Sequence, residues 1–184
     1  MPEQNDKKTK VISLNRILPS LYDWVGTLAI ALTAFSLLFV FVVRIVGVDG
    51  SSMNPTYRDG DLLLLSLLND RYERGDVVVV DRYTEDPLIK RIIAVGGDTL
   101  SIDPEGNVFL NGRLLKEKYI QGKTVLRDFS GEIRVPKGYL FIMGDNRSVS
   151  KDSRSEEIGL VSVKDVIGEA VYCVWPPKSI GSVR

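Results

Sequence analysis

An uncharged apolar run near the N-terminus constrains this chain more than any other feature. From Trp24 to Val43 there are 20 residues without a charge. A helix rises about 1.5 Å per residue, so a helix of this length spans about 30 Å, the hydrocarbon thickness of a bilayer. A buried core helix is the alternative, but it would normally keep a polar face, and the residues from Ala31 to Val43 show almost none. The pattern predicts a transmembrane helix, which we place within residues 21–46.

A cleaved signal peptide is the second alternative for this run. Signal peptides carry apolar cores of about 7–15 residues, followed by a cleavage site of small residues. Here the run is longer, and Arg44-Ile45-Val46 follows it. We therefore interpret the run as an uncleaved anchor.

The charges on the two sides of the run predict its orientation. Two basic residues, Arg44 and Arg58, follow within about 15 residues of its end, and the four that precede it are Lys7, Lys8, Lys10 and Arg16. The more basic flank stays in the cytoplasm. We expect a single-pass protein of the cell membrane, in contact with lipid, with residues 1–20 as a cytoplasmic tail and residues 47–184 as an extracytoplasmic domain.

The sequence after the span predicts a mainly β fold. Its apolar runs are short and bounded by turn residues, and they cover residues 62–66, 76–80, 88–95, 99–103, 108–110, 139–143 and 167–175. Asn111-Gly112 predicts a tight hairpin between residues 108–110 and 113–115, and residues 103–106 predict a second turn. At 184 residues and 44% hydrophobic, the chain is sufficient for one folded domain behind the anchor.

Composition excludes several classes of function. The formal net charge is zero and no long run of like charges occurs, so nothing indicates nucleic-acid binding. Cys173 is the only cysteine and histidine is absent, so we expect no disulfide within the chain, no metal site and no cofactor. A Ser-His-Asp triad cannot form within one chain that lacks histidine. The base for any serine nucleophile must therefore be Lys, Asp or Glu.

The segment from Gly50 to Thr56, Gly-Ser-Ser-Met-Asn-Pro-Thr, places a serine in a stiff turn just after the predicted span. Pro55 fixes its own φ and biases Asn54 away from the helical region, while Gly50 permits conformations that other residues resist. An ordinary polar turn is one interpretation. A nucleophile site at Ser52 is the other.

Lys90 lies inside an apolar run, Leu88 to Val95, where strand alternation places it on the same face as Ile92 and Ala94. A free lysine, with a pKa of about 10.4, is protonated at neutral pH, but burial can lower that pKa by up to about 3–5 units. Lys90 could then act as a base. The alternative is an edge-strand lysine whose ammonium group reaches water.

A polar loop, Gly144 to Arg154, follows the apolar run of residues 139–143 and could support a site. A solvated loop rich in turn formers is the alternative. The loop also contains Ser148-Val149-Ser150-Lys151, a match to the Ser-x-x-Lys motif of penicillin-binding enzymes. The Ser-Asp-Asn and Lys-Thr-Gly elements that accompany that motif are absent from the sequence.

Four motifs in this order after an N-terminal span make the chain resemble bacterial type I signal peptidase. They are Ser-Met-Asn-Pro-Thr at 52–56, Arg-Gly-Asp-Val-Val-Val at 74–79, Lys-Arg-Ile-Ile at 90–93, and Gly-Asp-Asn-Arg with Ser-x-Asp-Ser-Arg at 144–154. The resemblance runs from about residue 20 to the C-terminus, and the single span is similar to the Gram-positive kind. It implies a membrane-anchored Ser-Lys endopeptidase with a β-rich catalytic domain that removes signal peptides from exported preproteins.

The resemblance also implies the roles of individual residues. Ser52 would be the nucleophile, Lys90 the general base, and Ser150 the hydroxyl that hydrogen-bonds and orients the lysine. Two ion pairs would support the site, Asp152 with Arg154 and Asp145 with Arg91.

Substrate positions follow from the same resemblance. Shallow pockets for small residues at positions −1 and −3 of secreted preproteins would be lined by Val48, Met53 and Ile89. The oxyanion region would be the turn of Gly50, Ser51 and Ser52. Some family members carry a hydroxyl where this chain has Gly50, so we expect the turn to accommodate a residue with a Cβ there. The alternative is that Gly50 adopts a positive φ, where a serine would cost about 1–3 kcal/mol of strain.

The chain departs from the family pattern at two further places. Ser148-Val149 replaces the polar pair usual after Gly-Asp-Asn-Arg, and residues 94–98 read Ala-Val-Gly-Gly-Asp where Gly-Leu-Pro-Gly-Asp is more familiar. Loop conformation is therefore less well predicted than the pair of Ser52 and Lys90.

Two other classes of function compete with a monomeric peptidase. A catalytically silent relative could act as a membrane scaffold in surface-organelle assembly, but such proteins typically lack one of the catalytic pair, and this chain has both Ser52 and Lys90. A self-cleaving Ser-Lys repressor would need a DNA-binding module and no membrane span.

Overall fold

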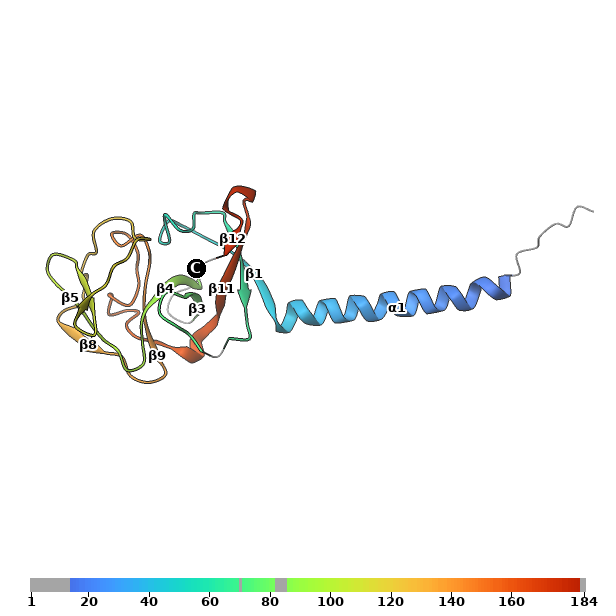
Figure 1. Cartoon of the computed structure of the whole chain (residues 1–184), viewed down its shortest axis with the longest axis horizontal. Helices are drawn as coiled ribbons and strands as arrows, with labels where there is room; N and C mark the ends of the chain where they lie inside the picture. The colour runs from blue at the N-terminus through green and yellow to red at the C-terminus, as the bar shows by residue number, and fades with distance from the viewer. Residues whose placement is uncertain (1–13, 70, 82–85, 183–184) are drawn as a thin grey trace, which may run out of the picture. The chain divides into compact units, whose positions relative to one another are not determined.

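The computed structural model describes residues 14–69, 71–81 and 86–182 of the chain. The chain divides into two units, Met1–Val40 and Phe41–Arg184. The described residues of the first unit all belong to helix α1 (Leu14–Phe41), whose last residue begins the second (Figure 1). The second unit is built from strands and two short 3₁₀ helices, η1 (Val163–Asp165) and η2 (Pro177–Ser179). The mainly β fold predicted from the sequence is confirmed.

Helix α1 is long and apolar enough to cross a membrane over Tyr22–Phe41, with a mean hydropathy of 2.1. Every side chain in this range is exposed. An apolar helix with no protein cover is stable where lipid surrounds it, because all of its backbone hydrogen bonds are internal.

The helix ends earlier than the sequence pattern predicts. Residues 43–46, expected within the membrane segment, belong instead to strand β1 (Val43–Gly47). Five consecutive residue pairs join β1 antiparallel to β2 (Leu62–Ser66), from Val43 opposite Ser66 to Gly47 opposite Leu62. Because valine and isoleucine are β-branched, this pairing competes well with continuation of the helix.

The larger sheet carries eight strands. Its path is β1, β2, β11 (Val166–Trp175), β3 (Val77–Val80), β4 (Leu88–Val95), β9 (Tyr139–Met143) and β10 (Val161–Ser162), with β12 (Gly181–Ser182) paired to β11. Neighbouring strands are antiparallel (Figure 1). Register shifts in β11, and between Ile92 and Ala94 in β4, interrupt the ladder. Such bulges bend a strand and increase its twist.

The smaller sheet has four strands in the order β7 (Arg113–Leu114), β6 (Val108–Leu110), β5 (Thr99–Ile102) and β8 (Glu132–Arg134). The predicted hairpin joins β6 to β7. Asn111 and Gly112 both have positive φ, 53° and 75°, as a two-residue hairpin turn with this twist requires.

Seven predicted strands correspond to observed ones. Four have the predicted bounds, namely β2, β4, β6 and β9, and the other three, β3, β5 and β11, differ by one residue at one end. Strands β1, β8, β10 and β12 were not predicted.

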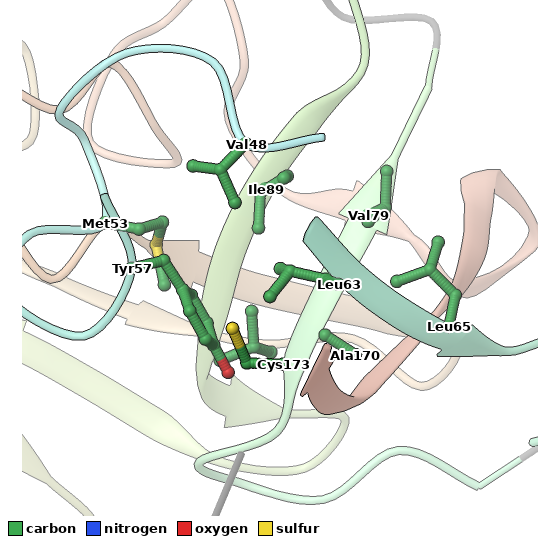
Figure 2. Packing of buried hydrophobic residues seen from close by; sticks show 10 residues of the cluster. Val48, Met53, Tyr57, Leu63, Leu65, Val79, Ile89, Ala170 and Cys173 are labelled. Atoms are coloured by element: carbon green, nitrogen blue, oxygen red, sulfur yellow. The ribbon is translucent and has the colours of Figure 1, made fainter. Parts of the chain in front are cut away.

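A cluster of buried apolar side chains fixes the segment between β1 and β2 to the larger sheet. Its members are Val48, Met53, Tyr57, Leu63, Leu65, Val77, Val79, Ile89, Ala170 and Cys173. In Figure 2 the side chains of Val48, Met53 and Tyr57 point from this segment toward those of the strands. Burial of an aliphatic side chain of this size contributes about 1.5–3 kcal/mol. We define Gly50–Thr56 as the nucleophile turn. Packing of Met53 within it, and of Val48 and Tyr57 beside it, holds this turn against the larger sheet.

Candidate active site

The nucleophile turn lies between β1 and β2 and is held at both ends. The Gly50 N–H donates to Asp59 Oδ1 at 2.9 Å, and the Tyr57 N–H donates to Met53 O at 2.9 Å. Met53 is fully buried, so its neighbour Ser52 has little freedom to move. Ser51 is exposed, whereas Ser52 is half-buried.

Gly50 corrects one expectation from the sequence. Its φ is +80°, a left-handed conformation that residues with a Cβ rarely adopt. The expectation that the turn accommodates a residue with a Cβ at this position is wrong. The space around Gly50 is open, so the obstacle is the backbone conformation rather than a neighbouring atom.

Lys90 reaches Ser52 from strand β4. Its Nζ donates to Ser52 Oγ at 3.0 Å and to Ile89 O at 2.9 Å. Lys90 is only 3% exposed, so the alternative in which its ammonium group reaches water is excluded. This geometry matches a base and its nucleophile, although the catalytic roles of both residues stay predictions.

Burial lowers the pKa of Lys90 from 10.5 to about 8, because desolvation disfavours the charged amine. The carboxylates of Asp152 and Asp145 raise it in part. With a pKa near 8, roughly a tenth of the amine is neutral at pH 7, compared with well under a thousandth for a free lysine. The amine can therefore accept a proton under physiological conditions.

The loop Gly144–Arg154, which we call the catalytic loop, backs the nucleophile turn. The Asn146 N–H donates to Ser52 O at 2.9 Å, and Asn146 Nδ2 donates to Ser51 O at 3.2 Å. Gly144 is packed so closely that a Cβ there would lie 2.5 Å from Ser52 O and 2.2 Å from Ser150 Oγ. Only glycine fits at that position without displacing the nucleophile turn.

The ion pair expected between Arg91 and Asp145 is present and bidentate. Arg91 Nε lies 2.8 Å from Asp145 Oδ1, and Nη2 lies 2.7 Å from Oδ2. Thr56 Oγ1 also donates to Asp145, which ties the C-terminal end of the nucleophile turn to the catalytic loop. The guanidinium of Arg91 stacks over the ring of Tyr119, 4.1 Å from its centroid.

The second expected ion pair is also present. Arg154 Nη2 and Nε each lie 2.8 Å from the carboxylate of Asp152, and both residues are buried. Burial alone would raise the pKa of Asp152, but the hydrogen bonds and charge of Arg154 lower it below its usual value. Asp152 Oδ2 accepts from the Gly144 N–H at 2.9 Å, so this pair fixes the start of the catalytic loop.

Ser150 is fully buried beside Gly144, but the predicted hydrogen bond to Lys90 is not formed in this structure. Within the part of the chain that the structure describes, Ser150 Oγ makes no hydrogen bond of ordinary geometry, although it lies close enough to Asp152 to help lower the pKa of that carboxyl group. Its predicted role as the group that orients Lys90 stays a prediction.

A groove of about 790 Å³ leads to the pair of Ser52 and Lys90. All three residues predicted to contact substrate line it, namely Val48, Met53 and Ile89. One wall runs from the end of β1 to Asp49, and another runs from Asp86 to the start of β4.

Several contributors to the site were not predicted. Thr56, Asn146 and Arg147 lie in quoted motifs without an assigned role, and Glu117 and Tyr119 lie in a segment with no sequence signal at all. Their contacts join residues about 30 to 95 positions apart, as with Asn146 and Ser51 or Arg147 and Glu117. Pattern and propensity cannot reveal such pairs, because they depend on the tertiary fold.

Comparisons with known proteins agree with this geometry. The family model "Signal peptidase, peptidase S26" matches residues 21–175. The chain belongs to this family. The resemblance to type I signal peptidases noted in the sequence is therefore confirmed, and the fold described above is that of a peptidase family.

Individual members of the signal peptidase family match over most of their length. Signal peptidase I of Bacillus licheniformis is 32% identical over 170 residues, which cover 85% of this chain and 90% of the relative. Signal peptidase I of Bacillus amyloliquefaciens is 30% identical over 186 residues, which cover 94% of this chain and 95% of that relative. A solved signal peptidase I from Enterococcus faecalis aligns at 25% identity with a TM-score of 0.43, covering 54% of this chain and 97% of that one.

Proposed function

We propose that this chain is a membrane-bound serine endopeptidase that cleaves signal peptides from exported preproteins by a Ser-Lys dyad mechanism. The observation that carries the proposal is the hydrogen bond of 3.0 Å between Lys90 Nζ and Ser52 Oγ inside a desolvated site. A nucleophile and a base within hydrogen-bond reach are what acyl transfer without histidine needs. Membership of the signal peptidase family supplies the substrate class.

Acylation begins with neutral Lys90. Its Nζ takes the proton of Ser52 Oγ as the oxygen attacks the scissile carbonyl carbon. The resulting oxyanion needs hydrogen-bond donors, and the Ser52 N–H donates to no other group in the described residues. Collapse of the tetrahedral intermediate breaks the C–N bond, and the Lys90 ammonium returns the proton to the leaving amine of the mature protein.

Deacylation repeats these steps with water. Lys90, neutral again, takes a proton from a water molecule that attacks the acyl-enzyme carbonyl. The C–O bond to Ser52 breaks, and the proton returns to Ser52 Oγ. The signal peptide leaves with a free carboxylate, so one amine serves as base and acid in both halves of the reaction.

Among the described residues, the start of β4 offers an unpaired edge at which a substrate peptide can bind. Leu88–Lys90 pair with β3 on one side, while β9 pairs with β4 only from Arg91 onward. In the described residues no strand lies on the other side of Leu88–Lys90, so an extended peptide can add there as a strand. Alternate side chains would then point toward the shallow apolar walls, which suit small residues such as alanine at positions −1 and −3.

The geometry argues against the silent scaffold. A scaffold has no requirement for an amine that is desolvated and directed at a serine hydroxyl, and burying that amine costs stability. We further propose that the enzyme works as a monomer at the outer face of the cell membrane, anchored by α1.

Cleavage of one secreted preprotein tests the proposal. Purified protein in detergent should cut it once, after a small residue, as located by mass spectrometry. Ser52→Ala should lose at least about 10³-fold in rate, as expected when a nucleophile is removed. Ser51→Ala is the matched control and should keep most of its activity, because Ser51 lies outside the pair. An active Ser52→Ala variant, or a cut after lysine or arginine, would contradict the proposal.

A further inference from the structure

A nine-residue segment, Glu117–Val125, lies along the outer side of the catalytic loop. The backbone of Gln121 bridges to that of Asn146 in parallel, with Gln121 N donating to Asp145 O at 2.8 Å and Arg147 N donating to Gln121 O at 2.9 Å. The same residue of the catalytic loop, Asn146, holds Ser52 O on its other side. The loop is therefore clamped between this segment and the nucleophile turn.

All three arginines that brace the catalytic loop contact this segment. Arg91 stacks on Tyr119, and Arg154 Nη1 donates to Val125 O at 2.7 Å. Arg147, which has no exposed surface, forms the most extensive contact. Its guanidinium pairs with the carboxylate of Glu117 through two nitrogens, with Nη1 2.8 Å from Oε2.

Glu117 joins the arginines that flank the site. Its carboxylate also accepts from Tyr119 OH at 2.8 Å, and the ring of Tyr119 lies under Arg91, the partner of Asp145. Arg147, the other partner of Glu117, donates from Nε to Gly144 O at 3.1 Å. The carboxylate of Glu117 is thus linked to Gly144 through Arg147, and to Asp145 through Tyr119 and Arg91.

We propose that Glu117 is a positioning residue for the reaction. It neutralises and orients buried Arg147 and fixes Tyr119 under Arg91, and these contacts set the position of Gly144. A Cβ at Gly144 would lie 2.5 Å from Ser52 O, and the Asn146 N–H donates to the same oxygen, so a displacement of the loop toward the turn would move the nucleophile relative to Lys90. A misplacement of about 1 Å at a reacting group can cost about 10²-fold in rate.

The test compares Glu117→Gln with Glu132→Gln, a matched control in β8 whose side chain is exposed. This inference rests on the proposed function, so cleavage of a preprotein by the unmodified enzyme must be established first; if that enzyme fails to cleave, the proposed function fails. At a temperature where circular dichroism shows each variant folded, Glu117→Gln should lower kcat about 10- to 100-fold with KM unchanged within about twofold. Glu132→Gln should match the unmodified enzyme.

A second pair of variants keeps the proposal testable if Glu117→Gln does not fold. Tyr119→Leu removes the ring under Arg91 but leaves the pair of Glu117 and Arg147, and should lower kcat about 3- to 10-fold. Tyr119→Phe keeps the ring but loses the hydrogen bond to Glu117, so its kcat should lie between that of Tyr119→Leu and that of the unmodified enzyme. A folded Glu117→Gln or Tyr119→Leu variant with unchanged kcat, or one in which only KM rises, would overturn the positioning role while leaving the proposed function intact.

Discussion

At the residue scale, the environment of one amine determines what this site can do. The sequence holds no histidine that could activate Lys90, and burial alone accounts for the lowering of its pKa. The carboxylates of Asp152 and Asp145 raise the pKa of Lys90, but each is paired with an arginine. A carboxylate paired with a guanidinium stabilises the lysine ammonium less than an unpaired carboxylate would. The two ion pairs therefore help to keep part of the Lys90 amine neutral, as its predicted role as base requires.

The rate of preprotein cleavage should depend on pH through Lys90. The neutral amine is the active form and its pKa is about 8, so kcat/KM should rise with pH, reach half its maximum near pH 8 and level off above that. Lys151→Ala, which changes another lysine lining the groove, should leave the profile unchanged. A flat profile, or a midpoint near that of a free lysine, would remove Lys90 from the role of base.

Gly50→Ser should reduce activity. Forcing a serine to a φ of +80° costs about 1–3 kcal/mol and shifts the turn two residues before the nucleophile. Asparagine tolerates this conformation better, so Gly50→Asn should retain more activity than Gly50→Ser. Steady-state kinetics with a preprotein substrate would measure the difference.

Gly131→Ser is the control for strain alone, because Gly131 has a φ of +78° and open space around it. It should lower the melting temperature but leave kcat/KM unchanged. Full activity of Gly50→Ser would show that the turn can relax, and that glycine is dispensable beside the nucleophile.

Local signals in the sequence made Ser52 and Lys90 candidates, because proline and glycine flank a short turn and a charge interrupts an apolar strand. The resemblance added their predicted roles and the two ion pairs, but the backbone contacts that hold the turn were not predicted. The close approach of Gly144 to Ser52 O and the capture of that carbonyl by Asn146 join positions more than 90 apart, and no local pattern encodes such contacts.

At the scale of elements, strands with a clear apolar pattern were predictable and short ones were not. β10 and β12 have two residues each, too few to show an alternation of period two. β1 was concealed for a different reason: Val43–Gly47 continues the apolar composition of the helix, and only its pairing with β2 makes it a strand. Here tertiary pairing overrides local composition.

The boundary between helix and strand predicts the effect of two truncations. A chain that starts at Val42 keeps β1 and the bond from Leu67 N to Val42 O, so it should fold without detergent and cleave a soluble peptide substrate. A chain that starts at Val48 loses all five pairs between β1 and β2. It should melt at a lower temperature and have little activity.

Thermal melts and peptide cleavage would compare the two truncations directly. Equal stability and activity would show that β1 is not part of the catalytic fold. An unfolded Val42 truncation would instead show that the catalytic unit depends on α1.

At the scale of the whole molecule, the chain combines an exposed apolar helix with a β unit that has its own cores. A membrane-anchored peptidase acts on substrates that reach the membrane face on which its catalytic unit lies. Under the proposed function, preproteins must therefore present their signal peptides on the face where the β unit lies. Orientation is then decisive for function, and the basic residues before α1 predict it.

Labelling of single cysteines tests that orientation. Cys173 is the only cysteine, so Cys173→Ala gives a background without thiols. In this background, Lys178→Cys places a thiol at an exposed position of the β unit, and Gln4→Cys places one in the tail. A membrane-impermeant thiol reagent applied to intact wall-free cells should label Lys178→Cys, and should label Gln4→Cys only after the membrane is permeabilised. Labelling in the reverse pattern would put the β unit in the cytoplasm, where no translocated signal peptide could reach Ser52.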